Sequence, residues 1–409
     1  MANSRRTRLL AKINQRASWR WAKRGLFFLI FIGVFANFIA NDKPYYCEYQ
    51  GEWYMPLFRA VAVDIGLAQW PADQLNWRWY ELDGLENDYW PPVGYSPQRI
   101  DILRKYMSPL DEQEVERWQF RHWLGTDNLG RDTLASLIWG TRVALIIGIA
   151  SMVIATFVGL LLGSLAGFFG NDRWLSSRAQ RIGGGIGLLL GMYWGFLVRR
   201  PVLDAGQTGW YYLSALILII GACWLGSYLA RRLFPHSGHS SALPIDDLIM
   251  RGIETLNAIP ALLLLLSIVA VIKRPSLFSI IMILGLLRWT GIARFVRGEL
   301  LRVRTLEYMQ ATQVMGISPG RALFRHALPN AMGPVYVAIA FGIAGAILIE
   351  ASLSFIGIGI PDDVVTWGSL LRNARSSASA WWLAIFPGLA IFVTITIFNL
   401  LGEAISEEV

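Results

Sequence analysis

Residues 293–331 read ARFVRGELLRVRTLEYMQATQVMGISPGRALFRHALPNA. This stretch joins two strongly apolar blocks, 276–293 and 333–349, each about as long as a helix that crosses a bilayer. It is rich in Arg and lacks a long apolar run, so we expect it to lie outside the bilayer. The fold therefore depends on membrane spans and on the polar segment between two of them.

The same stretch predicts a helical hairpin. Apolar residues recur at roughly helical spacing until Gly316 breaks the run. Ser318 can cap a second short helix that has Pro319 in its first turn, and residues 328–330, Leu-Pro-Asn, are expected to end it. A basic loop that contacts anionic lipid is the alternative that these residues leave open.

The composition excludes a soluble enzyme. Of the 409 residues, 54% are hydrophobic and only 16% are charged, whereas soluble domains carry roughly 25% charged residues. The mean hydropathy is +0.42. A chain this apolar would expose too much hydrocarbon to water as a soluble globule.

Eight apolar blocks are candidate spans, and each can satisfy its backbone hydrogen bonds in lipid as a helix. They are residues 25–41, 143–170, 182–198, 211–230, 255–272, 276–293, 333–349 and 380–401. The first block is expected to be a retained signal anchor. The sequence thus predicts an all-α polytopic membrane protein of about eight helices.

The basic residues predict the orientation, because cytoplasmic segments retain Lys and Arg. Residues 1–24 hold eight Lys or Arg and no acid, and residues 294–325 hold another basic cluster. Both termini, including the tail 403–409, are therefore expected in the cytoplasm. The aromatic-rich segment 42–135, in which acids outnumber bases, is expected in the periplasm or outside the cell.

A family resemblance rests on the hairpin. Gln310-Ala311-Thr312, then Gly316, then His326 to Pro329-Asn330 resemble the EAA loop of permeases of binding-protein-dependent ABC importers. Further stretches match the peptide-importer branch in the same order along the chain. They are HWLGTDNLGRD at 122–132, RFVRGE at 294–299, EASLSFIGIG at 350–359, WG at 367–368, FPG at 386–388 and FNLLG at 398–402.

The resemblance implies a type I ABC importer fold. A permease domain would cover 136–402, with six core helices and a two-helix insert within 171–245. The coupling loop would be 294–331. The chain looks like the second permease of oligopeptide or dipeptide importers. Its long outer loop is more like that of the variant that also admits peptide-nucleotide antibiotics.

The resemblance also implies the partners. They would be a second homologous permease, two ABC ATPase domains that bind ATP and Mg²⁺, an extracytoplasmic peptide-binding protein and membrane lipid, in a bacterial inner membrane. The chain lacks a Walker phosphate loop. We therefore expect no catalytic residue, cofactor or metal in it, and no nucleic-acid partner.

We expect twelve residues to contact the ATPases: Glu307, Gln310, Ala311, Thr312, Gly316, Ser318, Pro319, Arg321, Arg325, His326, Pro329 and Asn330. Gln310 departs from the family pattern, which has Glu there. Glu307 lies three residues earlier on the same helix face and can supply the missing charge. The alternative is a weaker contact with the ATPase.

Other features point to packing or leave two interpretations open. Gly159, Gly163 and Gly167 lie four residues apart and are expected to let another helix approach closely. Three ionisable residues lie in or near the spans: Arg142, Arg288 and Glu350. They are functional candidates, but each is near a span end, where snorkelling explains it equally well.

Two other classes of function compete with an ABC permease. An ion-gradient-driven transporter or channel would employ acidic residues or His near the bilayer midplane, and the spans contain almost none. A membrane-anchored scaffold would instead use 42–135 as its active module. Dependence of transport on ATP would indicate an ABC permease, and dependence on an ion gradient would indicate an ion-driven transporter.

Overall fold

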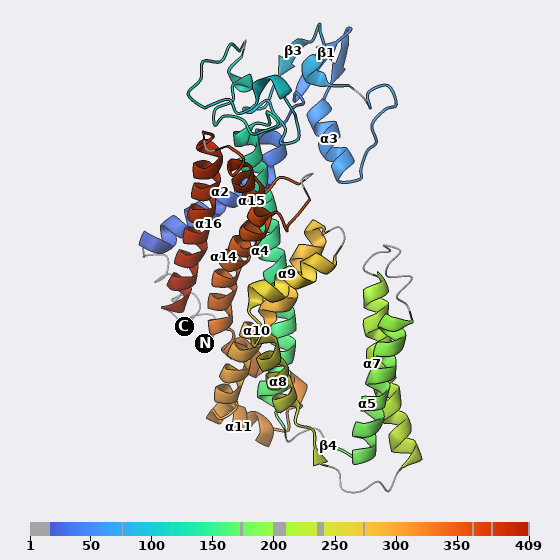
Figure 1. Cartoon of the computed structure of the whole chain (residues 1–409). Helices are drawn as coiled ribbons and strands as arrows, with labels where there is room; N and C mark the ends of the chain where they lie inside the picture. Colours follow the sequence, from blue (N-terminus) through green and yellow to red (C-terminus); the bar gives the residue numbers. More distant parts are fainter. Residues whose placement is uncertain are drawn as a thin grey trace. The chain divides into compact units, whose positions relative to one another are not determined.

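The computed structural model describes residues 17–75, 77–115, 117–171, 175–198, 210–234, 241–272, 275–361, 364–377 and 379–407. Most of the basic N-terminus, His236 and His239 lie outside these ranges. The chain divides into two compact units, Met1–Gly163 with Asn257–Val409, and Ser164–Leu256. Figure 1 shows the helices and strands of each unit.

Within the described residues, five helices are long and apolar enough to cross a membrane. They are α2 (Ala17–Ile39), α4 (Thr133–Ser164, extended by a π-helical turn at Leu165–Phe169), α10 (Leu277–Val303), α14 (Gly333–Ile356) and α16 (Trp382–Ser406). A sixth span results if α8 (Ile245–Asn257) and α9 (Ala261–Val271) are counted as one helix bent by 80°. The predicted helical, multi-span fold is confirmed.

Two predicted blocks have different bounds. Block 255–272 is not one helix, because α8 ends at Asn257 and α9 begins after Pro260. Proline lacks the amide proton that would continue α8 and suits the start of the next helix. Block 276–293 is extended instead, since α10 runs ten residues beyond it to Val303.

The long helices of the larger unit pack in a connected set. The helix α14 packs against α10, α16 and the short helix α15 (Trp367–Ala374), and α16 also packs against α2. A buried apolar cluster, which includes Ile147, Leu284 and Leu353, joins α4, α10 and α14.

The glycines of α4 face α10. A Cβ atom at Gly159 would lie 2.7 Å from the Ile292 side chain, and one at Gly163 would lie 2.6 Å from the Ala293 carbonyl oxygen. Real Cβ atoms do not approach neighbours so closely, so only glycine allows this helix contact. Gly167 is buried in the π-helical turn, which belongs to the smaller unit.

Between α2 and α4 the chain forms a small sheet with the antiparallel order β2-β1-β3. The strands are β1 (Tyr46–Tyr49), β2 (Glu52–Tyr54) and β3 (Glu86–Tyr89), and Cys47 pairs with Tyr54. The helix α3 (Pro56–Asp64) and 3-10 turns at Trp79–Glu81, Ile102–Arg104 and Trp118–Phe120 complete the segment. Cys47, Trp79 and Trp90 form its core, and burial raises the pKa of Cys47 to about 11.

The smaller unit consists mainly of two helices, α5 (Arg178–Met192, with a π-helical turn at Tyr193–Leu197) and α7 (Trp210–Leu233). These helices lie where the two-helix insert is expected, and they pack along each other. Gly187 faces the Ala222 carbonyl. Strands β4 (Leu175–Ser176) and β5 (Ser241–Ala242) pair antiparallel. Neither helix is among the five spans found in the described residues.

Candidate functional site: the hairpin between α10 and α14

The hairpin begins at the end of α10. Arg302 and Glu299 form an ion pair with an N–O distance of 2.7 Å, three residues apart on the helix surface. The Thr305 hydroxyl donates to the Arg302 carbonyl over 2.8 Å in the turn that follows. The first ten residues of the predicted loop are therefore the last turns of α10.

The helix α11 (Glu307–Val314) has a buried and an exposed face. Met309 and Thr312 are 1% and 3% exposed, and the Thr312 hydroxyl donates to the Met309 carbonyl. Glu307, Gln310 and Ala311 are exposed. Thr312 thus lies on the packed face of the hairpin, while the other predicted contact residues of this helix lie on its surface.

Gly316 makes the turn. Its φ angle of +68° is in the left-handed region, which glycine adopts without steric cost. Its amide donates to Gln313, and the Ile317 amide donates to Thr312, so α11 ends in a Schellman motif. Ser318 occupies the predicted cap position, but its side chain makes no capping hydrogen bond.

The second helix of the hairpin ends at Ala331, one residue beyond the Leu-Pro-Asn stretch that was expected to end it. It continues from α12 (Pro319–Ala322) through a π-helical turn at Leu323–Ala327 into α13 (Leu328–Ala331). A regular α-helix would bring the Pro329 ring against the carbonyl four residues earlier. We attribute the tolerance of Pro329 to the wider π turn.

Tyr308 joins the two helices of the hairpin and was missed by the sequence analysis. It is hydrogen-bonded to Asn330, and burial raises the pKa of its hydroxyl. The Asn330 amide also donates to the His326 carbonyl over 2.7 Å. Asn330 of the predicted motif therefore stabilises the hairpin internally. Tyr308 could be recognised only from its contact with Asn330 in the structure, because no sequence pattern marks it.

The tip of the hairpin exposes large apolar side chains. Val314 is 89% exposed, and Met315 and Phe324 are 68% and 69% exposed. Arg321, Arg325, Ser318, Pro319 and Pro329 are exposed beside them, and His326 is half-buried. Ala322, Leu323, Ala327 and Ala331 point inward. A packed inner face with an exposed apolar and basic outer face can dock a partner protein.

The motif at 122–132 lies elsewhere and has a different environment. His122 Nδ1 lies 2.9 Å from Asp132, and both side chains are fully buried. The Trp382 indole donates to the Thr126 carbonyl over 3.0 Å, and the Asn373 amide donates to Asp127 over 3.3 Å. These bonds tie the start of α4 to the α15–α16 region.

Of the three ionisable residues in the spans, Arg142 and Glu350 are hydrogen-bonded within the protein. Arg142 donates to the Gly33 and Val34 carbonyls and to Asn37, all in α2. Glu350 is 2% exposed and accepts a hydrogen bond from Ser354 over 2.7 Å, so snorkelling does not explain it. Arg288 lines a cavity of about 570 Å³ between α4, α10 and α14. In the described residues no cluster of His, Cys, Asp and Glu could hold a metal.

Comparison with known proteins identifies the class of the chain. Residues 222–409 match the family described as "Binding-protein-dependent transport system inner membrane component". The "Peptidoglycan transport system permease protein YejE" of Agrobacterium fabrum is 26% identical over 97% of this chain and 90% of the relative. The "Inner membrane ABC transporter permease protein YejE" of Escherichia coli is 26% identical over 97% of each chain.

A third relative is the "Oligopeptide transport system permease protein OppC" of Bacillus subtilis, which is 27% identical over 70% of each chain. The family match includes α9, α10, the hairpin, α14 and α16. These helices and the relatives agree on a multi-pass inner membrane protein. The match of residues 222–409 to the binding-protein-dependent transport system inner membrane components, together with relatives named as permease proteins, supports a permease subunit of an ABC importer.

Proposed function

We propose that the chain forms half of the pathway of an ATP-driven importer of peptides or modified peptides. Its relatives carry names that refer to oligopeptide and peptidoglycan transport. A second homologous permease would supply the other half of the pathway, and an extracytoplasmic binding protein would deliver the substrate. ATP and Mg²⁺ would be bound by two ATPase subunits.

The observation that carries this proposal is the exposed surface of the hairpin. Val314, Met315 and Phe324 are exposed on a segment whose inner face is packed. Burying one such side chain against a partner is worth about 1.5–3 kcal/mol. ATPase subunits that close on ATP would push on this rigid element and thereby switch the access of the pathway.

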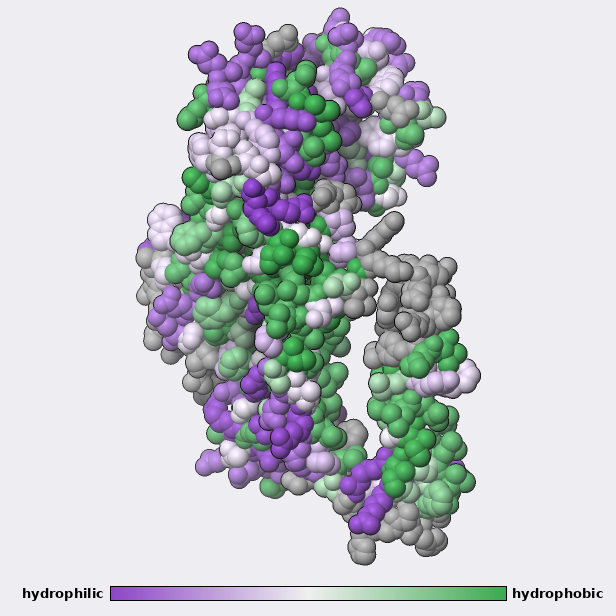
Figure 2. Space-filling view, in the orientation of Figure 1, coloured by the Kyte–Doolittle hydropathy of each residue, from purple (hydrophilic) through white to green (hydrophobic). Residues whose placement is uncertain are grey.

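The two polar ends of the larger unit fit this assignment. Figure 2 shows hydrophilic residues over the 42–132 segment and over the hairpin, with apolar residues along the helices between them. We assign the hairpin to the cytoplasm, where ATP is available, and the 42–132 segment to the opposite side. Glu307, exposed beside Gln310, supplies the negative charge that the family pattern places at the latter position.

The test is Phe324→Ser combined with Met315→Ser, measured as co-purification with the ATPase subunits and as ATP-driven peptide uptake. We expect about a tenfold or greater loss of ATPase binding with unchanged folding. The matched control is Leu103→Ser, which alters a side chain that is 96% exposed at the other end of the larger unit. Normal uptake by the double variant would overturn the coupling role. Uptake abolished by a protonophore but not by vanadate would favour an ion-driven transporter.

A further inference from the structure

The 42–132 segment contains a cavity of about 490 Å³ beside the ends of two spans. Its lining comes from the end of α2, from α3, from the loop that follows α3, from residues 96–100 and from Trp139 of α4. Small-molecule sites usually enclose about 300–1,000 Å³ and combine aromatic walls with a few polar groups. The cavity has this size and this composition.

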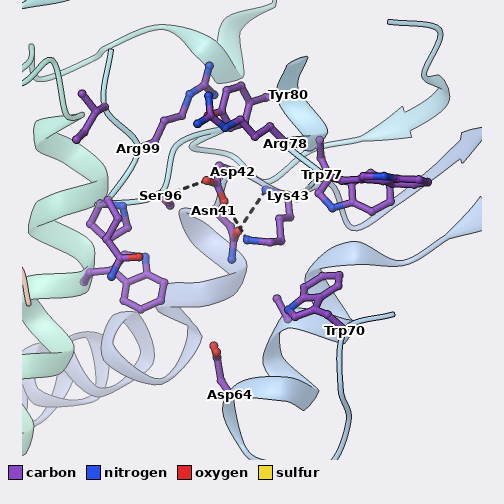
Figure 3. Close-up of a pocket in the computed structure, with 16 residues that line it drawn as sticks. Asn41, Asp42, Lys43, Asp64, Trp70, Trp77, Arg78, Tyr80, Ser96 and Arg99 are labelled. Carbon is purple, nitrogen blue, oxygen red and sulfur yellow. Dashed lines mark hydrogen bonds and ion pairs between the residues drawn. The ribbon is translucent and has the colours of Figure 1, made fainter. Parts of the chain in front are cut away.

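Opposite charges face each other across the cavity. Figure 3 shows Asp64 and Trp70 on one side, Lys43 near the centre, and Arg78, Tyr80 and Arg99 together on the far side. Because mixed charges line the cavity, it suits neither an anion such as a phospholipid phosphate nor a neutral sugar. It suits a molecule that carries one positive and one negative group.

Some of the charges already have structural partners. The Asp42 carboxylate accepts from the Ser96 hydroxyl over 3.0 Å and pairs with Lys43 over 3.4 Å. The Arg99 guanidinium lies 3.6 Å from the centre of the Tyr80 ring and donates to the Gly94 carbonyl. These groups form the framework of the cavity.

The two remaining charges, Asp64 and Arg78, are not part of this framework. Asp64 is exposed at the last residue of α3, where the helix dipole disfavours a carboxylate, so helix stability does not account for it. Among the described residues, the ion pair of Arg78 is with Glu81, and both side chains are more than half exposed. Such surface pairs contribute little and exchange easily for another carboxylate.

We propose that this cavity binds a short peptide with free termini, with the ammonium group at Asp64, the carboxylate at Arg78 and the chain against the Trp70 ring. The inference rests on the proposed peptide substrate and extends it, because the permease itself would hold the peptide outside the spans. Trp70 is half-buried, lines the cavity and takes part in none of the ring pairs found among the described aromatic residues, so a ligand in the cavity can contact its side chain.

The test measures binding to the purified full chain in phosphatidylcholine nanodiscs, by equilibrium dialysis with radiolabelled trialanine, N-acetyl-trialanine and trialanine amide. We expect each blocked peptide to bind about three- to fivefold more weakly than trialanine. Asp64→Asn should abolish the discrimination against the acetylated peptide alone. Arg78→Gln should abolish the discrimination against the amide alone.

Trp70→Ala should weaken the binding of all three peptides about tenfold. Trp118→Ala is the control, because Trp118 is exposed in the same segment but does not line the cavity. Variants that leave the discrimination unchanged would place any binding elsewhere and overturn the inference, as would displacement of trialanine by glycerol phosphate. No binding by the chain, together with normal ATP-driven uptake by the whole transporter, would also overturn it while leaving the proposed function intact.

Discussion

The hairpin and the 122–132 loop both carry motifs that resemble the same family, but the residues of one motif are mostly exposed and the polar residues of the other are buried. In the 122–132 loop, His122, Asp127 and Asp132 are almost completely buried. His122 and Asp132 pair with each other, and Asp127 accepts a hydrogen bond from Asn373. In the hairpin, only Thr312 of the twelve predicted contact residues is classed as buried, and apolar side chains are exposed at the tip.

The difference distinguishes two roles for the residues of a motif, namely bonds within the chain and contact with another subunit. The polar residues of the 122–132 loop serve this chain, because they fix the start of α4 against the α15–α16 region. The exposed residues of the hairpin make few contacts within the chain, which agrees with the proposal that they contact another subunit. Substitutions in the loop should therefore affect stability, whereas those in the hairpin should affect assembly.

The largest effect is expected from Asp132→Ala. It leaves buried His122 without its partner and removes the carboxylate that accepts from the Ala135 amide over 2.7 Å at the start of α4. We expect a loss of about 4 kcal/mol in the free energy of unfolding, measured by thermal or denaturant unfolding in detergent. Arg321→Ala, in the hairpin, should change it by less than about 0.5 kcal/mol. Equal unfolding midpoints for the two variants would show that the loop and the hairpin do not differ in their contribution to stability.

A matched pair of glycines gives an intermediate effect. Gly130 and Gly316 both have a positive φ, but a Cβ at Gly130 would lie 1.7 Å from the Asp101 carbonyl oxygen, whereas the space around Gly316 is open. Gly130→Ala should therefore cost about 3 kcal/mol of stability, and Gly316→Ala about 1 kcal/mol. The same unfolding measurement tests both. A larger cost at Gly316 would show that the hairpin is the more constrained region.

The smallest effect is expected from Tyr308→Phe, which removes the hydrogen bond to Asn330. The loss of about 1 kcal/mol should increase hydrogen exchange of the hairpin amides about fivefold, as measured by mass spectrometry. The matched Tyr336→Phe substitution in α14 should leave this exchange unchanged. Unaltered exchange in the Tyr308 variant would mean that packing alone holds the hairpin.

Local signals in the sequence predicted the hairpin well. Gly316 marks the end of a helix because the left-handed conformation is a local requirement. Hydropathy located the five long spans of the described residues but not the helix ends. Residues 294–303 are too polar for a span, yet they continue α10, with Arg302 and Glu299 paired on its surface. The extended helix past Pro329 depends on a π turn that no local pattern indicates.

The cavity could not have been predicted in the same way. Lys43, Asp64, Arg78, Arg99 and Trp139 are far apart in the sequence and meet only because the sheet, α3 and the end of α2 fold together. The sequence indicated an acidic, aromatic-rich segment but not where opposite charges would face each other. Likewise, Glu350 near a span end gave no sign of its burial beside Ser354.

The packing of α2 against α16 has a consequence for biosynthesis. The contact is close at Gly25, where a Cβ would lie 2.7 Å from Ile397. Roughly 340 residues separate the two helices, and at about 5–20 residues per second their synthesis takes on the order of 17–70 s. During that time the glycine face of α2 needs a temporary neighbour, such as lipid or the insertion machinery. The face of α2 that packs on α16 therefore gains its permanent neighbour long after α2 is made, whereas the bonds from Arg142 of α4 to α2 can form much earlier.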